Sequence, residues 1–202
     1  PYSPSTTSAI TLYAKWTGNT NTVNYDSKGG SIVTSGSFIT GGSIASAPTN
    51  PTRAGYTLAG WSATDGGTVV TFPYSPSATD AITMYAKWTA NTNTVTYNSK
   101  GGTSVTAGSF TTGGSIASAP TAPTRTGYAF DGWSATDGGT ALTFPYSPTA
   151  TDAITLYAKW TANSNTVTYD SKGGSAVTAG SFLSGGSISS APTAPTRAGY
   201  TL

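Results

Sequence analysis

The chain of 202 residues contains no cysteine and no histidine. These absences remove thiol nucleophiles, disulfide bonds, imidazole bases and the usual zinc ligands. All seven acidic residues are aspartates, and the many serines have no histidine that could activate them. We therefore expect no enzyme, and neither a catalytic residue, a metal site nor a cofactor.

Charge is also scarce, because charged residues make up 8% of the chain and the formal net charge is +2. Without a basic stripe the chain lacks the long-range attraction on which nucleic-acid binding depends. No run of 18 apolar residues exists, so we expect no membrane span in this segment. Abundant Gly, Ser, Thr and Ala together with few charges are typical of extracellular bacterial proteins, and we expect a location outside the cell or at the bacterial cell surface.

The most informative feature that is present is an internal repeat of 72 residues. Residues 18–89 and 90–161 are identical at 56 of 72 positions, without an insertion. The pattern predicts two full repeats, 18–89 and 90–161, the C-terminal part of a repeat at 1–17 and the N-terminal part of another at 162–202. We expect this chain to be a window from a longer array.

Within one repeat the pattern predicts a mainly β fold with four or five short strands and little or no helix. Alternating polar and apolar residues or turn signals indicate strands at 94–97, 105–110, 127–133, 142–144 and 153–160. Glycines after Ser99 and after Asp137 predict turns. The only candidate for helical structure is one turn at 149–153.

Aromatic residues are the expected source of a core, since a 72-residue module without disulfides buries proportionally little surface. The predicted core residues are Tyr25, Tyr56, Trp61, Trp88, Tyr97, Tyr128, Phe130, Trp133, Leu156 and Trp160. Four tyrosines are candidates for contact with a ligand, namely Tyr74, Tyr85, Tyr146 and Tyr157. Aromatic rings of this kind could also form the core or pack neighbouring modules together.

Three short motifs suggest chemistry, and each has a simpler interpretation. Asp137-Gly138-Gly139 could belong to a calcium loop, but a single carboxylate beside glycines is more typical of a turn. The Ser-Lys-Gly-Gly string at 99–102 lacks the spacing of a phosphate-binding loop and also predicts a turn. Lys87 and Lys159 could form a crosslink to an asparagine, although nothing in their spacing requires one.

Three strings together resemble a known family: TVTYNSKGG at 94–102, GYAFDGW at 127–133 and LYAKWTA at 156–162. This combination is similar to the Listeria–Bacteroides repeat, also known as the B repeat of internalin-type surface proteins. The resemblance covers both full repeats and the visible parts of the others, and the first full repeat departs from it with Leu58 in the place of Phe130. It implies a β-grasp-like module that occurs in tandem in secreted or wall-attached bacterial proteins.

Two classes of function remain. The first is a structural stalk or spacer of an adhesin-like surface protein, in which each repeat advances the chain by on the order of 30 Å. The second is a multivalent array of weak binding modules for a host protein or a surface polysaccharide. A variant of the first is an extracellular filament in which identical chains complete each other's partial repeats. The expected partners are therefore neighbouring repeats, identical chains and a polysaccharide or host protein.

Overall fold

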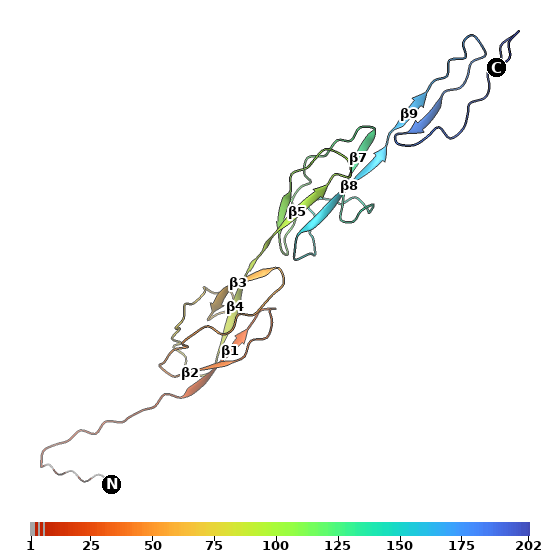
Figure 1. Cartoon of the computed structure of the whole chain (residues 1–202). Helices are drawn as coiled ribbons and strands as arrows, with labels where there is room; N and C mark the ends of the chain where they lie inside the picture. The colour runs from red at the N-terminus through yellow and green to blue at the C-terminus, as the bar shows by residue number, and fades with distance from the viewer. Residues whose placement is uncertain (1–2, 4, 6) are drawn as a thin grey trace. The chain divides into compact units, whose positions relative to one another are not determined.

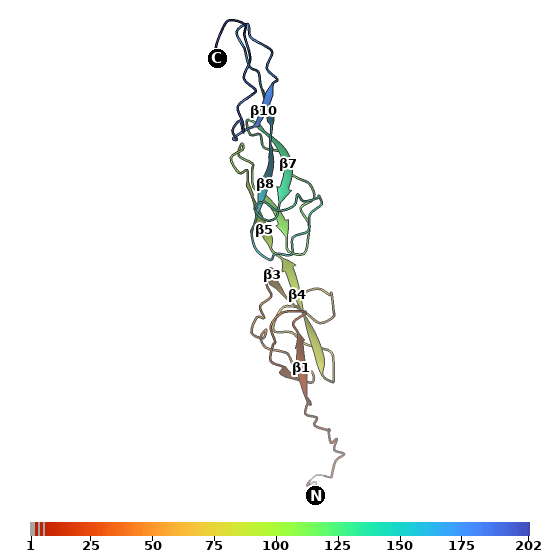
Figure 2. The same cartoon turned by 90° about the vertical axis from the view of Figure 1, so that its right-hand side faces the viewer.

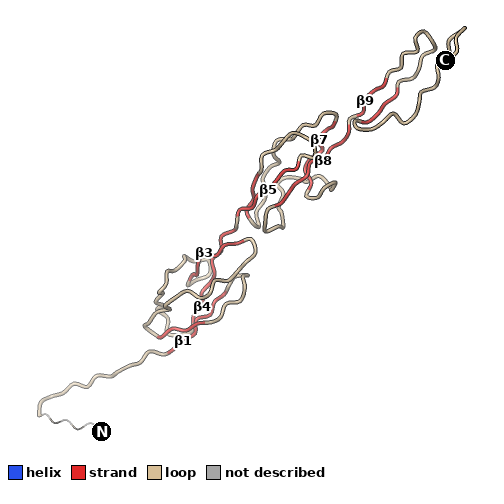
Figure 3. The backbone as a smooth tube through the Cα atoms, in the orientation of Figure 1, coloured by secondary structure: helices blue, strands red, loops and turns tan. Residues whose placement is uncertain are grey.

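The computed structural model describes residues 3, 5 and 7–202, and residues 1, 2, 4 and 6 of the leading segment lie outside it (Figure 1). The chain divides into two compact units, Pro1–Thr89 and Ala90–Leu202. Every regular element in the described residues is a β-strand, and none is a helix (Figure 3). The mainly β prediction is therefore confirmed.

The first unit contains one four-stranded sheet. Its strands are β1 (Thr20–Asp26), β2 (Gly36–Ile39), β3 (Tyr56–Ser62) and β4 (Ile82–Ala90), in the order β2-β1-β4-β3. β1 is antiparallel to β2 and parallel to β4, and Val23 lies opposite Ile82. The first and last strands of the repeat therefore lie together at the centre of its sheet, where both are flanked by a partner.

The second unit repeats this sheet and adds a hairpin. Its strands are β5 (Thr92–Asn98), β6 (Gly108–Thr111), β7 (Tyr128–Ser134) and β8 (Ile154–Ala162), in the order β6-β5-β8-β7. β7 is antiparallel to β8, with a register shift between Phe130 and Gly132. β9 (Ser164–Val167) and β10 (Gly180–Leu183) then form an antiparallel pair (Figure 2).

Two local predictions were wrong. Residues 142–144 do not form a strand: the Leu142 N–H donates to the Trp133 carbonyl of β7 at 2.7 Å, but this contact does not extend into a ladder. Residues 149–153 bend but form no helical turn. The strand expected at 105–110 begins later, at Gly108. Residues 142–144 thus form a loop, because no neighbouring strand pairs with them continuously.

Each four-stranded sheet buries one tryptophan beneath a tyrosine from its first strand. Trp61 and Trp133 are each 1% exposed. Their rings lie 4.9 Å from those of Tyr25 and Tyr97 respectively. An aromatic side chain buries about 150–250 Å², and at roughly 25 cal/mol per Å² each contributes several kcal/mol. This contribution exceeds the cost of the two indole N–H groups, which are buried without a hydrogen-bond partner in the described structure.

One segment has a strand sequence without forming a strand. Residues 9–17 and 153–161 have the same nine-residue sequence, AITLYAKWT. In β8, Leu156 is 1% exposed, whereas the equivalent Leu12 is 72% exposed and Trp16 is 89% exposed. No described strand pairs with residues 9–17.

Candidate functional site

A tight turn of unusual conformation follows the first strand of every copy. Lys28 has a φ of 50° and Gly29 a φ of 87°, and the Gly30 N–H donates to the Ser27 carbonyl at 3.1 Å. Lys100 and Lys172 adopt the same positive φ in the later copies. A left-handed conformation costs a residue with a side chain roughly 1–2 kcal/mol. The turn confirms the prediction for the Ser-Lys-Gly-Gly string, and it places a lysine where glycine or asparagine would be less strained.

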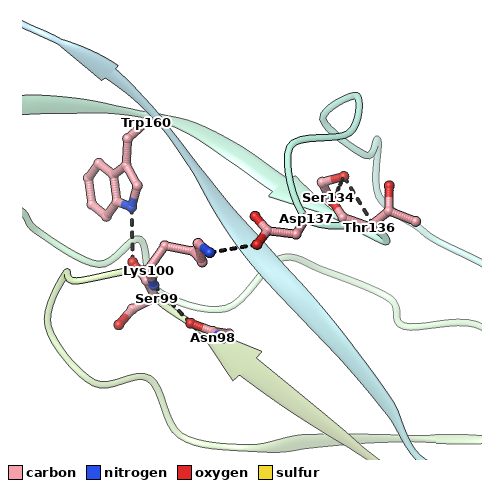
Figure 4. Close-up of polar contacts among 7 residues, drawn as sticks. All are labelled: Asn98, Ser99, Lys100, Ser134, Thr136, Asp137 and Trp160. Atoms are coloured by element: carbon pink, nitrogen blue, oxygen red, sulfur yellow. Dashed lines mark hydrogen bonds and ion pairs between the residues drawn. The ribbon is translucent and has the colours of Figure 1, made fainter.

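This lysine extends across the module to the Asp-Gly-Gly turn. The Lys28 ammonium lies 2.8 Å from Asp65, and the Lys100 ammonium lies 2.6 Å from Asp137 (Figure 4). The hydrogen bond to Asp65 raises the pKa of Lys28. Both partners are largely exposed, and such pairs contribute little to stability.

An arginine lies on a tyrosine ring in every copy. The guanidinium carbon is 4.0 Å from the ring centre in the Arg53–Tyr56 pair, 3.8 Å in Arg125–Tyr128 and 4.1 Å in Arg197–Tyr200. The two residues meet because a turn with a glycine of positive φ joins them, and the Tyr56 N–H donates to the Arg53 carbonyl at 3.1 Å. The sequence signal for this pair is Arg-x-Gly-Tyr, which the patterns of strands and turns alone did not reveal.

The tryptophan of the closing strand lies beside this arginine. The Trp88 indole N–H donates to the Ser27 carbonyl at 2.8 Å, and the Trp160 indole N–H donates to the Ser99 carbonyl at 2.9 Å (Figure 4). The Arg53 guanidinium carbon is 6.0 Å from the Trp88 ring centre. The indole is therefore held in place by a polar bond while its ring remains half-buried.

Together these side chains form what we call the cationic–aromatic groove. In the first unit it encloses about 220 Å³ and is lined by Lys28, Arg53, Tyr56, Tyr85, Lys87 and Trp88, with Asp65, Gly66 and Gly67 on one side. The Lys87 ammonium donates to the Gly67 carbonyl at 2.9 Å, and the Lys28 ammonium lies 5.8 Å from the Tyr85 ring centre. In the second unit the Lys100–Asp137 and Lys159–Gly139 contacts recur, but the cavity of about 670 Å³ there is lined by Arg125, Tyr128 and Trp160 and not by the two lysines.

The predicted site residues are distributed between the groove and the core. Of the candidate ligand-facing tyrosines, Tyr85 lines the groove, its equivalent Tyr157 is half-buried in β8, and Tyr74 and Tyr146 pack against the two cores. Among the predicted core residues, Trp61, Tyr97, Trp133 and Leu156 are buried, and Tyr25, Trp88, Phe130 and Trp160 pack against the cores. Tyr56 and Tyr128 are half-buried beneath their arginines.

A second set of contacts joins residues 90–161 to residues 162–202. The Asn163 N–H donates to the Gly127 carbonyl at 2.8 Å, and the Tyr128 hydroxyl donates to the Ser184 carbonyl at 3.2 Å. A Cβ atom added to Gly127 would lie 2.7 Å from the Ser184 Oγ, and one added to Gly185 would lie 2.7 Å from the Tyr128 hydroxyl. We call these contacts the repeat junction, and glycines permit its close approach.

The remaining motifs form ordinary structure. Asp137-Gly138-Gly139 is a turn in which the Gly139 N–H donates to the Thr136 carbonyl at 3.1 Å. Within the described residues no group of three His, Cys, Asp or Glu side chains could hold a metal ion. The Lys159 ammonium donates to the Gly139 carbonyl at 3.3 Å. In the described part of the chain, no helix has the length and apolar character needed to cross a bilayer.

A family model described as the Listeria–Bacteroides repeat domain matches residues 22–87, 94–159 and 166–202. The chain belongs to the Listeria–Bacteroides repeat family. Each match to this repeat begins in the first strand of a sheet, and the two full matches end in the closing strand, at Lys87 and Lys159. The cationic–aromatic groove therefore combines the Ser-Lys-Gly-Gly, Arg-x-Gly-Tyr and Tyr-Ala-Lys-Trp elements of one repeat.

Three similar proteins are longer than this chain, which aligns with only part of each. Two proteins of Evansella cellulosilytica, provisionally named as a membrane protein and a Gly-rich membrane protein, are 35% and 33% identical to 95% and 85% of this chain. Internalin H of Listeria monocytogenes is 38% identical over 58% of the chain. The matched region spans 28%, 20% and 21% of these relatives, respectively.

Proposed function

We propose that the chain is a structural spacer in a bacterial surface protein, where it holds other domains away from the cell. The observation that carries this proposal is the repeat junction. β8 ends at Ala162 and β9 begins at Ser164, so a single residue separates them. Hydrogen bonds from Asn163 and Tyr128 then tie the following hairpin to the preceding module. A connection of a single residue restricts movement between the two parts, which suits a chain that maintains a distance or transmits force.

The family and its relatives support a surface location and a role without catalysis. Two relatives are provisionally named as membrane proteins, and the third is an internalin. The groove holds cations, a single carboxylate and aromatic rings, a set that provides no activated nucleophile. We extend the surface location, and with it an adhesin-like context, to this chain as part of the proposal.

We also propose that each full repeat is a β-grasp-like module. The strand order β2-β1-β4-β3, with a parallel pair at the centre, supports this assignment. The connection between β2 and β3 runs as an extended loop through Pro48 and Pro51. Proline has a fixed φ and no N–H, so this segment is poorly suited to a helix.

The spacer proposal predicts a constant gain in length for each added repeat. We would express chains of two, four and six repeats and measure the maximum dimension of each by small-angle X-ray scattering. The expected gain is on the order of 30 Å per repeat, the diameter of a compact module of this size. A dimension that grows only as the cube root of mass would mean that the modules collapse together, and would contradict a spacer.

Exchange of strands between identical chains is a second candidate, and the exposed segment 9–17 favours it. This segment has the sequence of a central strand but exposes Leu12 and Trp16, while β9 has one edge without a described partner. Unpaired edges and free strands can combine between chains. A molecular mass that rises with concentration in light scattering would support such a filament, and a constant monomeric mass would contradict it.

A further inference from the structure

We propose that the cationic–aromatic groove binds an acidic polysaccharide, with one sugar unit against the aromatic rings and its carboxylate between the arginine and the lysines. This activity goes beyond the spacer function and does not depend on it. The proposal rests on the distribution of charge, on the half-buried aromatic side chains beside it and on the strained lysine that recurs in every copy.

The cations of a full repeat converge on this one place. Residues 18–89 contain three cations, Lys28, Arg53 and Lys87, and all three line the groove. The same residues contain three carboxylates, of which Asp65 alone lines it. Three positive charges and one negative charge leave the groove at +2. The few cations of the repeat therefore lie together, and their combined positive charge would attract an anion to the groove.

The second full repeat has the same set of three cations. Lys100, Arg125 and Lys159 are the only cations of residues 90–161 and occupy the equivalent positions. The Lys100 ammonium is bonded to Asp137, and Arg125 covers the Tyr128 ring. An arginine beside lysines suits a carboxylate, because the planar guanidinium can donate two parallel hydrogen bonds to it.

The aromatic side chains provide an apolar surface next to these cations. Tyr56, Tyr85 and Trp88 line the groove and all three are half-buried, with the Arg53 guanidinium over one face of the Tyr56 ring. The bond from the Trp88 indole N–H to the Ser27 carbonyl fixes that ring before any ligand arrives. A ring that is already ordered loses little conformational entropy on binding. Flat apolar rings beside charge fit a sugar acid better than a simple anion.

The positive φ of the lysine is a separate observation that points to a functional role for this residue. Lys28, Lys100 and Lys172 all have φ near 50°, although glycine would adopt this conformation without strain. Strained backbone that persists in every copy is a reason to look for a function. Here the turn directs the ammonium across the module, to Asp65 in the first repeat and to Asp137 in the second.

Repetition compensates for weakness at a single groove. Exposed pairs of opposite charge are worth only about 0.2–1 kcal/mol each. An acidic polymer that spans several repeats would gain affinity from the covalent connection between grooves. A nucleic acid is a poorer ligand, because the charges are separated into small groups rather than continuous along the chain.

The first experiment uses the unmodified chain and its five indole N–H signals in a nitrogen–proton correlation spectrum. We would titrate it with an oligogalacturonate and, separately, with neutral dextran and inorganic polyphosphate. The proposal expects oligogalacturonate to shift the signals of Trp88 and Trp160 and to leave the buried Trp61 and Trp133 unchanged. The exposed Trp16, outside any groove, is an internal control and should not respond.

Several outcomes would overturn the proposal. A response of Trp16 as large as that of Trp88 would mean nonspecific contact with exposed rings. An equal response to neutral dextran would show that the cations of the groove do not contribute to binding. An equal response to polyphosphate would show that charge alone is sufficient and that no sugar unit is recognised. No response to oligogalacturonate at low salt would exclude the ligand class.

The second experiment changes the charge inside and outside the grooves by the same amount. Lys87→Gln combined with Lys159→Gln lowers the net charge by two, as does Lys15→Glu in the segment before the first sheet. We expect the double variant to weaken oligogalacturonate binding about two- to fivefold at each groove. Lys15→Glu should leave it unchanged, and equal losses in both variants would refute a localised site. Unchanged melting temperatures would show that both variants remain folded.

Discussion

At the scale of single residues, glycine determines where the tryptophan of the closing strand can lie. A Cβ atom added to Gly30 would lie 2.7 Å from Cζ2 of Trp88, and one added to Gly102 would lie 2.6 Å from Cζ2 of Trp160. Such distances are too short for any real contact, and an indole ring cannot move as a flexible chain end would. The second glycine of the Ser-Lys-Gly-Gly turn is therefore needed for contact with the indole, and the first for its positive φ.

Gly102→Ala should displace the Trp160 ring and destabilise the second module by about 1–3 kcal/mol, the usual cost of overpacking. Gly138→Ala is the matched control, because its added Cβ meets nothing within 4 Å and carries only the cost of a positive φ, roughly 1–2 kcal/mol. Urea unfolding monitored by far-ultraviolet circular dichroism would measure both. Equal destabilisation by the two variants would show that contact with the indole is unimportant.

At the scale of elements, strand formation requires a partner as well as a suitable sequence. The nine residues at 153–161 lie between β5 and β7, and burial of Leu156 and Ala158 stabilises them there. The identical nine residues at 9–17 lie outside a sheet. Alternation of polar and apolar residues thus indicates how a segment would lie in a sheet, but an isolated strand cannot satisfy its backbone groups.

Leu156→Ala and Leu12→Ala change the same residue in the same local sequence. The first should lower the free energy of unfolding by about 2–5 kcal/mol, because it leaves a cavity in a packed core. The second should change it by less than about 0.5 kcal/mol, as is usual for an exposed position. Equilibrium unfolding in urea would measure both. A substantial loss on Leu12→Ala would mean that the segment packs against a partner in solution.

At the scale of the whole molecule, the repeat junction connects the second full repeat to the hairpin that follows it. Within residues 90–202 the junction includes a hydrogen bond from the Asn163 backbone N–H to Gly127 and one from the Tyr128 hydroxyl to Ser184. Tyr128 therefore belongs both to the repeat junction, through its hydroxyl, and to the cationic–aromatic groove, because Arg125 lies on its ring. The groove and the junction are adjacent, and a ligand that moves this ring would also alter the junction.

Tyr128→Phe keeps the ring and removes the hydroxyl. Loss of that hydrogen bond, worth about 1 kcal/mol, should accelerate amide hydrogen exchange in β9 and β10 by roughly fivefold. Tyr200→Phe is the control, because it makes the same change at the equivalent position of the last copy, where the tyrosine residue is 67% exposed. If both variants left exchange unchanged, the Tyr128 hydroxyl would have no role in the junction.

The sequence by itself determined the repeat, the mainly β class and most strand positions, because these depend on short-range alternation and on glycine and proline. It also identified Trp133 and Leu156 as core residues, although it did not show that Arg53 lies over Tyr56 or that Lys28 extends to Asp65. The first contact depends on the conformation of the turn between Arg53 and Tyr56, and the second joins residues that are 37 apart in the sequence. Tertiary structure alone separated AITLYAKWT at 153–161 from AITLYAKWT at 9–17, since pairing and burial come from the surrounding chain.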